Sequence, residues 1–576
     1  MNIIGLYTNV NASACLLQGG QIVAVGEEER FNRIKANWTK SLPIQSIKYV
    51  LSEGRMTLDD IDYIAIGWDL NKYPQFMNNY VNEHFEGRSE IDEIIHDVNI
   101  SHWNPEYFKF RLEISLSKAG VQGKIPEIKF LNHHLTHAAS TFYLSPFSEA
   151  TVITVDGSGE ENATCVWKGS GDFLEKIHEV NVPNSLGWFY SAITEYIGFK
   201  AYSGEGKTMG LAPYGRDVKE IRESLEKVIQ ITDHNYTVDP SYIYFSDRTH
   251  SFKFTDKLVR LLGQPRKHDE DFTQFHKDVA YVAQDLLEEA VTNLVKYGIE
   301  QTGFRDICVA GGVGMNCKMN GKIQNMEEVD DVFVIPPSSD NGTSIGAALA
   351  LYAEEGYGCR DYELEHVYYG PKYRNHEIED ILQYTKVPYQ HCDNPEQTAA
   401  ELIYENAIVG WYQGRMEIGS RALGNRSILA NPLNPAMKDK INRDVKHRES
   451  FRPFCPSMLE SDANLYLKDP KSAPYMIVAY NALPGIKELL PSVVHHDNSV
   501  RPQTVTEESN WRYWTLLNEF KKISGHGVVL NTSFNIAGEP IVCTPQEAIR
   551  CFYGTGIDYL FIGDFMLCKT WGHKGL

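Results

Sequence analysis

The sequence predicts an α/β protein with two domains. Its 576 residues exceed the roughly 250–300 residues at which a single hydrophobic core stops growing. Short apolar strands that end in glycine or proline recur along the first part, with helical patterns between them, and this alternation is typical of α/β organisation. A polar, tyrosine-rich stretch at 353–375 then interrupts the pattern before it restarts.

The first part begins with a predicted hairpin. After the apolar run 3–7, two β-rich runs flank the turn 18–21. Four further short strands are predicted at 61–68, 150–157, 306–312 and 331–337. The clearest helix is predicted over 275–297, where apolar residues recur at helical spacing, with Gly298 as its C-cap.

The domain boundary is predicted near residue 366, giving domains 1–365 and 366–576. The second domain begins again with a helix that leads into a strand at 401–415. Its pattern runs through the strand at 526–535 to the C-terminal strands, so it is α/β or, in part, α+β.

Composition excludes several classes of protein. The formal net charge of −21 disfavours nucleic acid as a partner. The ten cysteines are scattered without a C-x-x-C pair, which indicates reduced, buried thiols and a cytoplasmic location. We find no signal-peptide pattern and no apolar run of about 18 residues, so we expect no membrane association.

Three glycine-rich turns follow predicted strands, at 156–159, 311–314 and 341–344. Glycine lets backbone N–H groups approach phosphate oxygens, although each turn taken alone is more simply a plain turn. The three together favour a nucleotide site in a fold of the actin/Hsp70/sugar-kinase type. Lys207, in the glycine-rich loop 203–215, suits a phosphate or a transferred acyl oxygen, or else lies on a solvated surface.

The stretch 131–140 places three histidines in five positions. If it is helical, His133 and His137 project from one face and can hold a metal ion, with Asp340 as a third ligand. Two imidazoles and one carboxylate suit a catalytic divalent metal, iron(II) included. His134 would point elsewhere and could contact substrate. The alternative is a helix start whose histidines bond backbone carbonyls.

The segment from Arg415 to Arg452 carries nine basic and four acidic residues within an acidic chain. Guanidinium groups match phosphate and carboxylate oxygens two at a time, so the segment predicts a site for a small polyanion such as a triphosphate. A solvated face of paired charges is the alternative. Polar residues at 531–535, after a strand, are further candidates for substrate contact.

These motifs resemble the NodU/CmcH-type O-carbamoyltransferases along almost the whole chain. The similar stretches are "EEERF", "HHLTHAAS", "TVDGSGE", "EGKTMGLAPYG", "AGGVGMNCKMNG", "SSDNGTSIGAAL", "GRMEIGSRALGNRSILANP", "KHRESFRPFCPS", "LNTSFN" and "GEPIVCTPQEAI". The resemblance implies a Kae1-like, actin-like N-terminal domain and a YrdC-like C-terminal domain. It implies that carbamoyl-adenylate is formed from carbamoyl phosphate and ATP, with Mg²⁺ bound to ATP. The carbamoyl group then passes to a hydroxyl of a small molecule, as in antibiotic or secondary-metabolite biosynthesis.

The resemblance also implies roles for individual residues. His133, His137 and Asp340 match the metal ligands, and the catalytic candidates are His133, His137, Asp156, Asn11 and Lys207. The nucleotide and donor candidates are Gly311, Gly312, Asn316, Arg415, Arg421, Lys446, Arg448, Arg452, Met476, Asn531 and Ser533. The acceptor stays open, although the aromatic-rich segment 69–115 favours a ring-bearing compound, and a homodimer stays open for the assembly.

The chain departs from the family pattern after its first strand. Members commonly carry Gly-His-Asp-Ala-Ser, whereas residues 9–13 are Asn-Val-Asn-Ala-Ser, so Asn11 replaces a carboxylate with an uncharged amide. Two other functions therefore stay open. One is a small-alcohol kinase of the actin-like fold, and the other is an ATP-binding regulatory protein without turnover.

Overall fold

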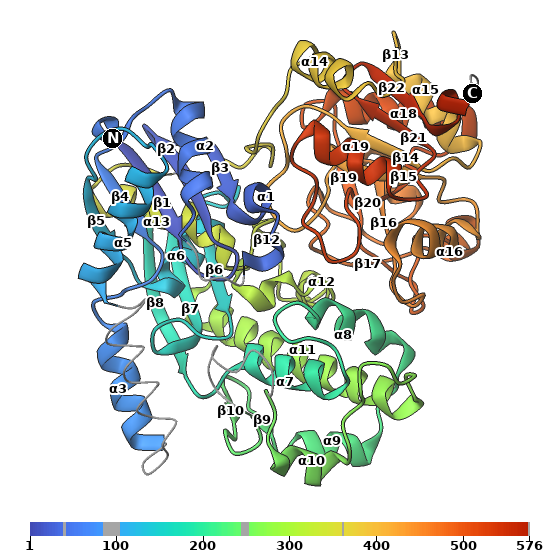
Figure 1. The fold of residues 1–576 in the computed structure, drawn as a ribbon. Helices are drawn as coiled ribbons and strands as arrows, with labels where there is room; N and C mark the ends of the chain where they lie inside the picture. The colour runs from blue at the N-terminus through green and yellow to red at the C-terminus, as the bar shows by residue number, and fades with distance from the viewer. Residues whose placement is uncertain (38–41, 85–103, 244–252, 360–361, 574–576) are drawn as a thin grey trace.

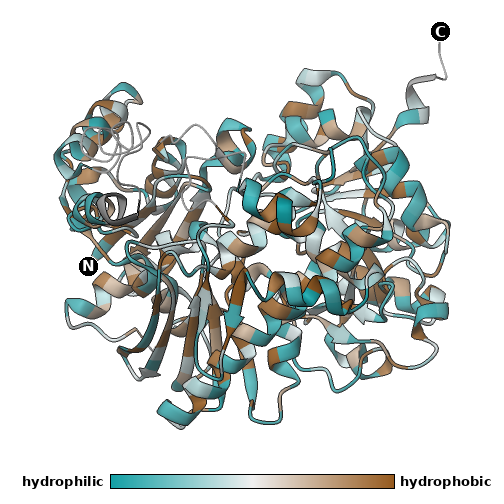
Figure 2. Cartoon of the chain, turned by 90° about the horizontal axis from the view of Figure 1, so that it is seen from below, coloured by the Kyte–Doolittle hydropathy of each residue, from teal (hydrophilic) through white to brown (hydrophobic). Residues whose placement is uncertain are grey.

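A computed structural model describes residues 1–37, 42–84, 104–243, 253–359 and 362–573, with the side chains of 80–84 and 572–573 left undescribed. Figure 1 shows an N-terminal part, coloured blue to yellow, beside a C-terminal part, coloured orange to red. Figure 2 shows apolar residues concentrated on the strands and hydrophilic residues on the outer helices. The predicted boundary between residues 365 and 366 remains a prediction.

The first sheet of the N-terminal part has the order β3-β2-β1-β4-β5. The predicted hairpin is confirmed, because Gly19 and Gly20 both take positive φ angles, of 57° and 86°, in the two-residue turn between β2 and β3. The strands are β1 (Asn2–Tyr7), β2 (Ser13–Gln18), β3 (Gln21–Glu27), β4 (Tyr63–Ile66) and β5 (Glu127–Phe130). The helices are α1 (Glu28–Asn32), α2 (Ile44–Gly54), α3 (Tyr73–His84), α5 (Pro105–Lys118) and α6 (His133–Phe142).

The second sheet repeats this topology in the order β8-β7-β6-β11-β12. In both sheets three antiparallel strands are followed by two parallel ones, which confirms the predicted α/β fold with its actin-like doubling. The strands are β6 (Glu149–Val155), β7 (Asn162–Ser170), β8 (Phe173–Asn181), β11 (Asp306–Ala310) and β12 (Asp331–Val334), with a separate hairpin of β9 (Ile229–Ile231) and β10 (Tyr236–Val238). The helices are α7 (Leu186–Tyr196), α8 (Glu205–Leu211), α9 (Lys219–Leu225), α10 (Asp256–Leu262), α11 (Gln274–Thr302), α12 (Cys317–Gln324) and α13 (Thr343–Glu354).

Helices α6 and α13 pack against each other between the two sheets. Helix α13 lies on β1 and β2, whereas α6 lies on β6 and β11. Their buried faces are rich in alanine and join residues of both sheets in one apolar cluster. The amino ends of the two helices therefore lie close together at the centre of the N-terminal part.

The C-terminal part is built on an eight-stranded mixed sheet in the order β13-β22-β21-β14-β15-β20-β16-β19. Its strands alternate as expected: Trp411 and Leu429 pack under α15 and α18, whereas Tyr412 and Ile428 face the opposite side. The strands are β13 (Gln390–His391), β14 (Val409–Tyr412), β15 (Arg426–Ala430), β16 (Cys455–Leu459), β19 (Gln503–Val505), β20 (Val528–Ser533), β21 (Tyr559–Ile562) and β22 (Phe565–Cys568), and β17 (Tyr480–Asn481) pairs with β18 (Ser499–Val500) apart from the sheet. The helices are α14 (Asn375–Thr385), α15 (Pro395–Tyr404), α16 (Met437–Ile441), α17 (Ile486–Leu489), α18 (Trp511–Ser524) and α19 (Pro545–Tyr553).

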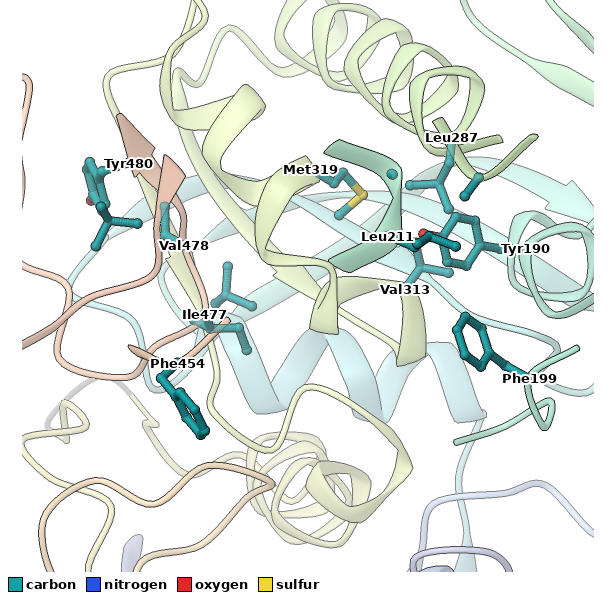
Figure 3. Close-up of a cluster of buried hydrophobic side chains, with 14 of the residues drawn as sticks. Tyr190, Phe199, Leu211, Leu287, Val313, Met319, Phe454, Ile477, Val478 and Tyr480 are labelled. Carbon is teal, nitrogen blue, oxygen red and sulfur yellow. The ribbon is translucent and has the colours of Figure 1, made fainter. Parts of the chain in front are cut away.

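Helix α12 joins the two parts. Met319 packs inside the N-terminal part, while Ile477 and Val478 of the C-terminal part lie on the other side of the helix (Figure 3). The backbone N–H of Ala479 donates to the carbonyl of Cys317 at 3.0 Å. A Cβ at Gly321 would lie 2.2 Å from the carbonyl oxygen of Ala479, so glycine is needed for this close approach.

One predicted helix end is wrong. Helix α11 runs to Thr302 and is capped by Gly303 at φ 77°, not by Gly298. Gly298 lies inside the helix, on the face that packs against the sheet. A Cβ at this position would lie 2.6 Å from Thr151 Cγ2. The glycine therefore allows close packing of helix on sheet and does not end the helix.

The predicted free thiols are confirmed, since all ten cysteines are free and nine are buried. In the described part of the chain, no helix combines the length and the apolarity needed to cross a bilayer.

Candidate functional site

Two histidines form one side of a buried cluster. The Asn132 side chain caps α6 by accepting from the N–H of Leu135, and this starts the helix at His133. The four-residue spacing then stacks His133 over His137, with their Nε2 atoms 3.1 Å apart and both side chains fully buried. The predicted helix and the predicted pairing of these two imidazoles are both present.

Two carboxylates complete the cluster. Asp156 follows β6, and its Oδ2 lies 2.9 Å from His137 Nε2 and 3.6 Å from His133 Nε2. Asp340 follows β12, and its Oδ1 lies 3.7 Å and 3.8 Å from the same two nitrogens. One ligand atom from each of the four residues lies within 4.8 Å of the others. The sequence prediction included Asp340 in this set but placed Asp156 with the catalytic and nucleotide residues.

Hydrogen bonds from outside the cluster orient its ligands. His133 Nδ1 donates to the carbonyl of Gly67 at 2.9 Å, which leaves the lone pair of Nε2 pointing into the cluster. The Tyr7 hydroxyl at the end of β1 donates to Asp340 Oδ2 at 2.5 Å, so Oδ1 stays available as a ligand. Sequence reasoning missed Tyr7, because the end of the first strand carries no motif.

The electrostatics of the cluster favour a bound cation. Burial lowers the pKa of His133, but the carboxylates of Asp156 and Asp340 raise it, and the pKa rises to about 9. The buried Asp156 Oδ2 faces the Nε2 atoms of both imidazoles. Two nitrogen and two oxygen ligands at these separations fit a divalent cation, and the mixed set suits a transition metal better than Mg²⁺.

His134 has a structural role instead of the predicted substrate contact. Its Nδ1 lies 2.9 Å from Thr154 Oγ1, and its Nε2 lies 3.0 Å from the carbonyl of Asn162. Burial lowers its pKa to about 3, so the imidazole is neutral. The ring is fully buried and ties α6 to the second sheet.

A cavity of about 930 Å³ extends from this cluster to the C-terminal part. Its lining includes Asp156 and Asp340 of the cluster together with residues of β20 and of the segment before β16. Its lining includes most of the predicted site residues: Asn11, Asp156, Lys207, Gly312, Asn316, Asp340, Arg421, Arg448, Arg452, Met476, Asn531 and Ser533.

Three predicted binding residues, Gly311, Arg415 and Lys446, lie outside the cavity lining, and their binding roles stay predictions. Arg415 donates to the carbonyl of Tyr369 at 2.7 Å and to that of Val23 at 3.2 Å, so it joins the N-terminal sheet to the C-terminal part. Lys446 Nζ donates to Asn535 Oδ1 at 2.8 Å and to the carbonyl of Ser533 at 2.5 Å. It therefore supports the loop after β20 from behind.

Four guanidinium groups form a cationic wall: Arg421, Arg448, Arg452 and Arg501. Burial and then Arg501 lower the pKa of Arg421 to about 10, and burial and then Arg452 lower that of Arg448 to about 9. These like charges are costly without an anion between them, so the wall is suited to bind one. Arg501 was not predicted, because it follows β18, far along the chain from the segment 415–452.

Backbone geometry places the remaining predicted residues. Gly311, at φ 98°, packs against β6, where a Cβ would lie 2.1 Å from the carbonyl oxygen of Val155. At Gly312 a Cβ would lie 2.9 Å from Asp156 Oδ1, so glycine leaves room for this carboxylate. Asn316 caps α12 by accepting from the N–H of Met319 at 3.1 Å. Met476 lines the cavity at φ 54°, a strained angle for a side chain of this kind.

Asn11 and Lys207 both line the cavity. Asn11, at φ 67°, takes a left-handed conformation in the turn between β1 and β2. Lys207 Nζ pairs with Glu449 Oε1 of the C-terminal part at 3.1 Å. Both predicted residues therefore face the cavity, and Lys207 also links the two parts.

Among solved structures, full-length HypF in its phosphate- and nucleotide-bound form is similar to this chain, with 14% identity, a TM-score of 0.31 and coverage of 62% of this chain and 56% of HypF. A ROK hexokinase from Thermus thermophilus gives 12% identity and a TM-score of 0.31, covering 62% of this chain and all of the hexokinase. The fold is assigned from the two repeated sheets of the N-terminal part.

Sequence relatives cover the chain far more completely. An uncharacterised protein of Synechocystis is 37% identical over 97% of this chain and 95% of its own length. Nodulation protein NolNO of Sinorhizobium fredii is 36% identical over 97% of this chain and 79% of its own length. Nodulation protein U of Rhizobium tropici is 27% identical over 99% and 96%.

Two family models account for most of the sequence. "Carbamoyltransferase N-terminus" matches residues 2–349, which hold the histidine–aspartate cluster. "Carbamoyltransferase C-terminus" matches residues 400–569, which hold the cationic wall. The chain is an enzyme that belongs to the carbamoyltransferase family.

Proposed function

We propose that the chain catalyses ATP-dependent O-carbamoyl transfer in two stages within one cavity. Carbamoyl phosphate and ATP form carbamoyl-adenylate at the cationic wall, and the carbamoyl group then passes to a hydroxyl of a small molecule at the histidine–aspartate cluster. The observation that carries this proposal is the cavity of about 930 Å³, which both groups of residues line. A shared cavity keeps a labile mixed anhydride away from bulk water.

The cationic wall suits the first stage. Carbamoyl phosphate and the triphosphate of ATP, which carries Mg²⁺, are both polyanions, and bidentate guanidinium groups hold such oxygens in fixed positions. Arg421 Nε has no partner among the described residues, and neither has Asn531 Oδ1. The Arg421 N–H can therefore donate a hydrogen bond to a bound substrate, and Asn531 Oδ1 can accept one from it.

The cluster suits the second stage. A divalent metal, for which we propose iron(II), would be held by His133, His137, Asp156 and Asp340 and would stabilise negative charge on the transferring group. Asn11 can orient the acceptor hydroxyl through its amide. An amide is not basic, so we assign the hydroxyl proton to a carboxylate of the cluster.

The acceptor is expected to be a small molecule with a ring. Of the aromatic-rich segment 69–115, residues 85–103 lie outside the described part of the chain, but Tyr73 and Met77 line the cavity. Trp68 lies beside them and packs against His133 with ring centroids 4.5 Å apart. An apolar wall next to the cluster favours a ring over a flexible polar chain.

Isotope exchange tests the proposal. The protein is incubated with ATP, carbamoyl phosphate and labelled pyrophosphate, and label is expected to enter ATP while AMP accumulates once an acceptor alcohol is added. A panel of natural-product alcohols then identifies the acceptor. Formation of ADP in place of AMP would indicate a kinase, and ATP binding without any turnover would indicate a regulatory protein.

A further inference from the structure

A short turn presents His495 to the cavity. The N–H of His495 donates to the carbonyl of Ser499 at 2.9 Å, and the N–H of Asn498 donates to the carbonyl of His495 at 3.2 Å. Asn498 closes the turn at φ 64°, an angle that asparagine tolerates better than most residues. The turn directly precedes β18, so His495 lies four residues before Ser499. Ser499, Val500 and Arg501 line the cavity together with His495.

Asp497 faces the inner side of this imidazole. Its Oδ1 lies 3.6 Å from His495 Nδ1 and accepts from the Ser499 hydroxyl at 2.6 Å. Its Oδ2 accepts from Lys318 Nζ of α12 at 2.5 Å. Burial raises the pKa of Asp497, but His495 and Lys318 lower it well below its usual range. An ionised carboxylate at Nδ1 favours the tautomer that carries its proton there.

The second ring nitrogen of His495, Nε2, has no hydrogen-bond partner among the described residues. The residue is 6% exposed and lines the cavity. Tyr214 packs edge-on to the ring with centroids 5.7 Å apart, which restricts its rotation. A buried, oriented imidazole with one free nitrogen is the arrangement that proton transfer requires.

The proposed activation reaction needs such a group. Release of both phosphate and pyrophosphate consumes one water, because the carbamoyl–phosphate bond must be hydrolysed before carbamate attacks ATP. Carbamoyl phosphate and water then give carbamate, hydrogen phosphate and one proton. A base beside the cationic wall would make the water nucleophilic while the arginines hold the departing phosphate.

We propose that His495, oriented by Asp497, is the general base that hydrolyses carbamoyl phosphate to carbamate. Nε2 takes one proton from water as its oxygen bonds to the carbamoyl carbon, and the bond from that carbon to the phosphate oxygen breaks. The proton then passes from Nε2 to the departing phosphate, and the second water proton leaves with the conversion of carbamic acid to carbamate. This inference rests on the proposed function, and Asp497 acts as a positioning residue.

Supplying carbamate directly tests the assignment. AMP formation is measured with wild-type protein and the His495→Ala variant, first with carbamoyl phosphate and then with carbamate from ammonium and bicarbonate. With carbamoyl phosphate the variant is expected to lose about 10²–10³-fold in rate, within the range typical of a general base. With carbamate it is expected to match the wild type. An equal loss with both donors would overturn the assignment.

A second measurement keeps the test decisive if carbamate is a poor donor. Free imidazole is expected to restore phosphate release from carbamoyl phosphate in His495→Ala and to have no effect on the wild type; absence of rescue would count against a proton-transfer role. Asp497→Asn is expected to lower kcat and leave KM unchanged. His496→Ala is the matched control, since that ring stacks on Tyr214 at 4.5 Å and is not part of the cavity lining.

The outcomes separate the two proposals. If wild-type protein forms no AMP from either donor, the proposed function fails and the inference fails with it. If wild-type protein forms AMP and His495→Ala keeps the full rate with carbamoyl phosphate, the inference alone is wrong.

Discussion

Tyr7 shows how a residue outside the histidine–aspartate cluster can affect the affinity of that cluster for a metal ion. Its hydroxyl donates to Asp340 Oδ2 at 2.5 Å and thereby turns Oδ1 toward the imidazoles. Partners of this kind typically change metal affinity by about 10–100-fold when they are removed. Because the phenol contacts a ligand and is not itself a ligand, its loss should weaken metal binding without abolishing it.

We expect Tyr7→Phe to raise the dissociation constant for a divalent metal about 10–100-fold, measured by titration of metal-stripped protein. His137→Ala removes a ligand and should bring bound metal well below one per chain by elemental analysis. Tyr236→Phe is the control, since that hydroxyl lies 2.8 Å from Thr164 Oγ1 and is not part of the cavity lining. Unchanged affinity in Tyr7→Phe would refute the orienting role.

Two arginines of the segment 415–452 should differ sharply in how much their substitution weakens ATP binding. Arg421 lines the cavity with a buried, unpartnered Nε, whereas the Arg443 side chain is 72% exposed and pairs with Asp444. We expect Arg421→Gln to weaken ATP binding about 10–100-fold, the value of a lost charged hydrogen bond, measured by calorimetry. Arg443→Gln should bind ATP like the wild type. Equal losses in both variants would indicate a general charge effect.

Single residues were predictable where local spacing determines their neighbours. His133 and His137 share a helix, so four residues of spacing are enough to pair them. Tyr7 and Arg501 could not be predicted, because their neighbours in the site are distant in sequence: Asp340 lies 333 residues from Tyr7, and Arg421 lies 80 residues from Arg501. Arg415 was predicted from the charge of its segment and Lys446 also from the family resemblance, but neither lines the cavity: Arg415 donates to backbone carbonyls, and Lys446 holds Ser533 and Asn535, which line it.

At the scale of elements, strands were predicted better than helix ends. Buried strands are short apolar runs, and β4, β6, β11 and β12 all fall within the predicted ranges or one residue beyond them. The end of α11 was misplaced because glycine has two uses. At Gly303 it provides a positive φ, and at Gly298 it provides space for the sheet, and only the tertiary structure distinguishes them.

The substitution Gly298→Ala tests whether Gly298 is needed to leave space for the sheet. Alanine favours a helix over glycine by about 1 kcal/mol, so an isolated helix would be stabilised. Here the Cβ would meet Thr151 Cγ2 at 2.6 Å, and overpacking of this kind costs about 1–3 kcal/mol. We expect a net loss of about 1 kcal/mol in the free energy of unfolding by denaturant titration. Glu300→Ala, at an exposed position of the same helix, should leave it nearly unchanged.

At the scale of the whole molecule, the class of fold was predictable and the docking of its parts was not. Two α/β patterns separated by a polar stretch predict two domains, but nothing in the periodicity indicates which surfaces meet. The contact depends on Gly321, whose missing Cβ admits the backbone of Ala479. A single glycine in a helix gives no sequence signal for such a contact.

Gly321→Val should separate the two stages of the reaction. The larger side chain must push residues 477–479 away from α12, so the cavity opens between the two parts. We expect AMP formation and metal content to persist while carbamoyl transfer to the acceptor falls at least about tenfold, because the intermediate is hydrolysed. Lys322→Ala, on the exposed side of α12, is the control. Parallel loss of all three properties would indicate misfolding and refute the docking role.

The four ligand residues come in equal shares from the two repeated sheets. His133 and His137 follow β5, the fifth strand of the first repeat, and Asp340 follows β12, the fifth strand of the second. Asp156 follows β6, the first strand of the second repeat. Tyr7 is at the matching place in the first repeat, at the end of β1. An ion held by these four residues would sense the angle between the two repeats. By thermodynamic linkage, any molecule that changes this angle on binding must change the affinity for the ion, and the ion must change the affinity for that molecule by the same factor.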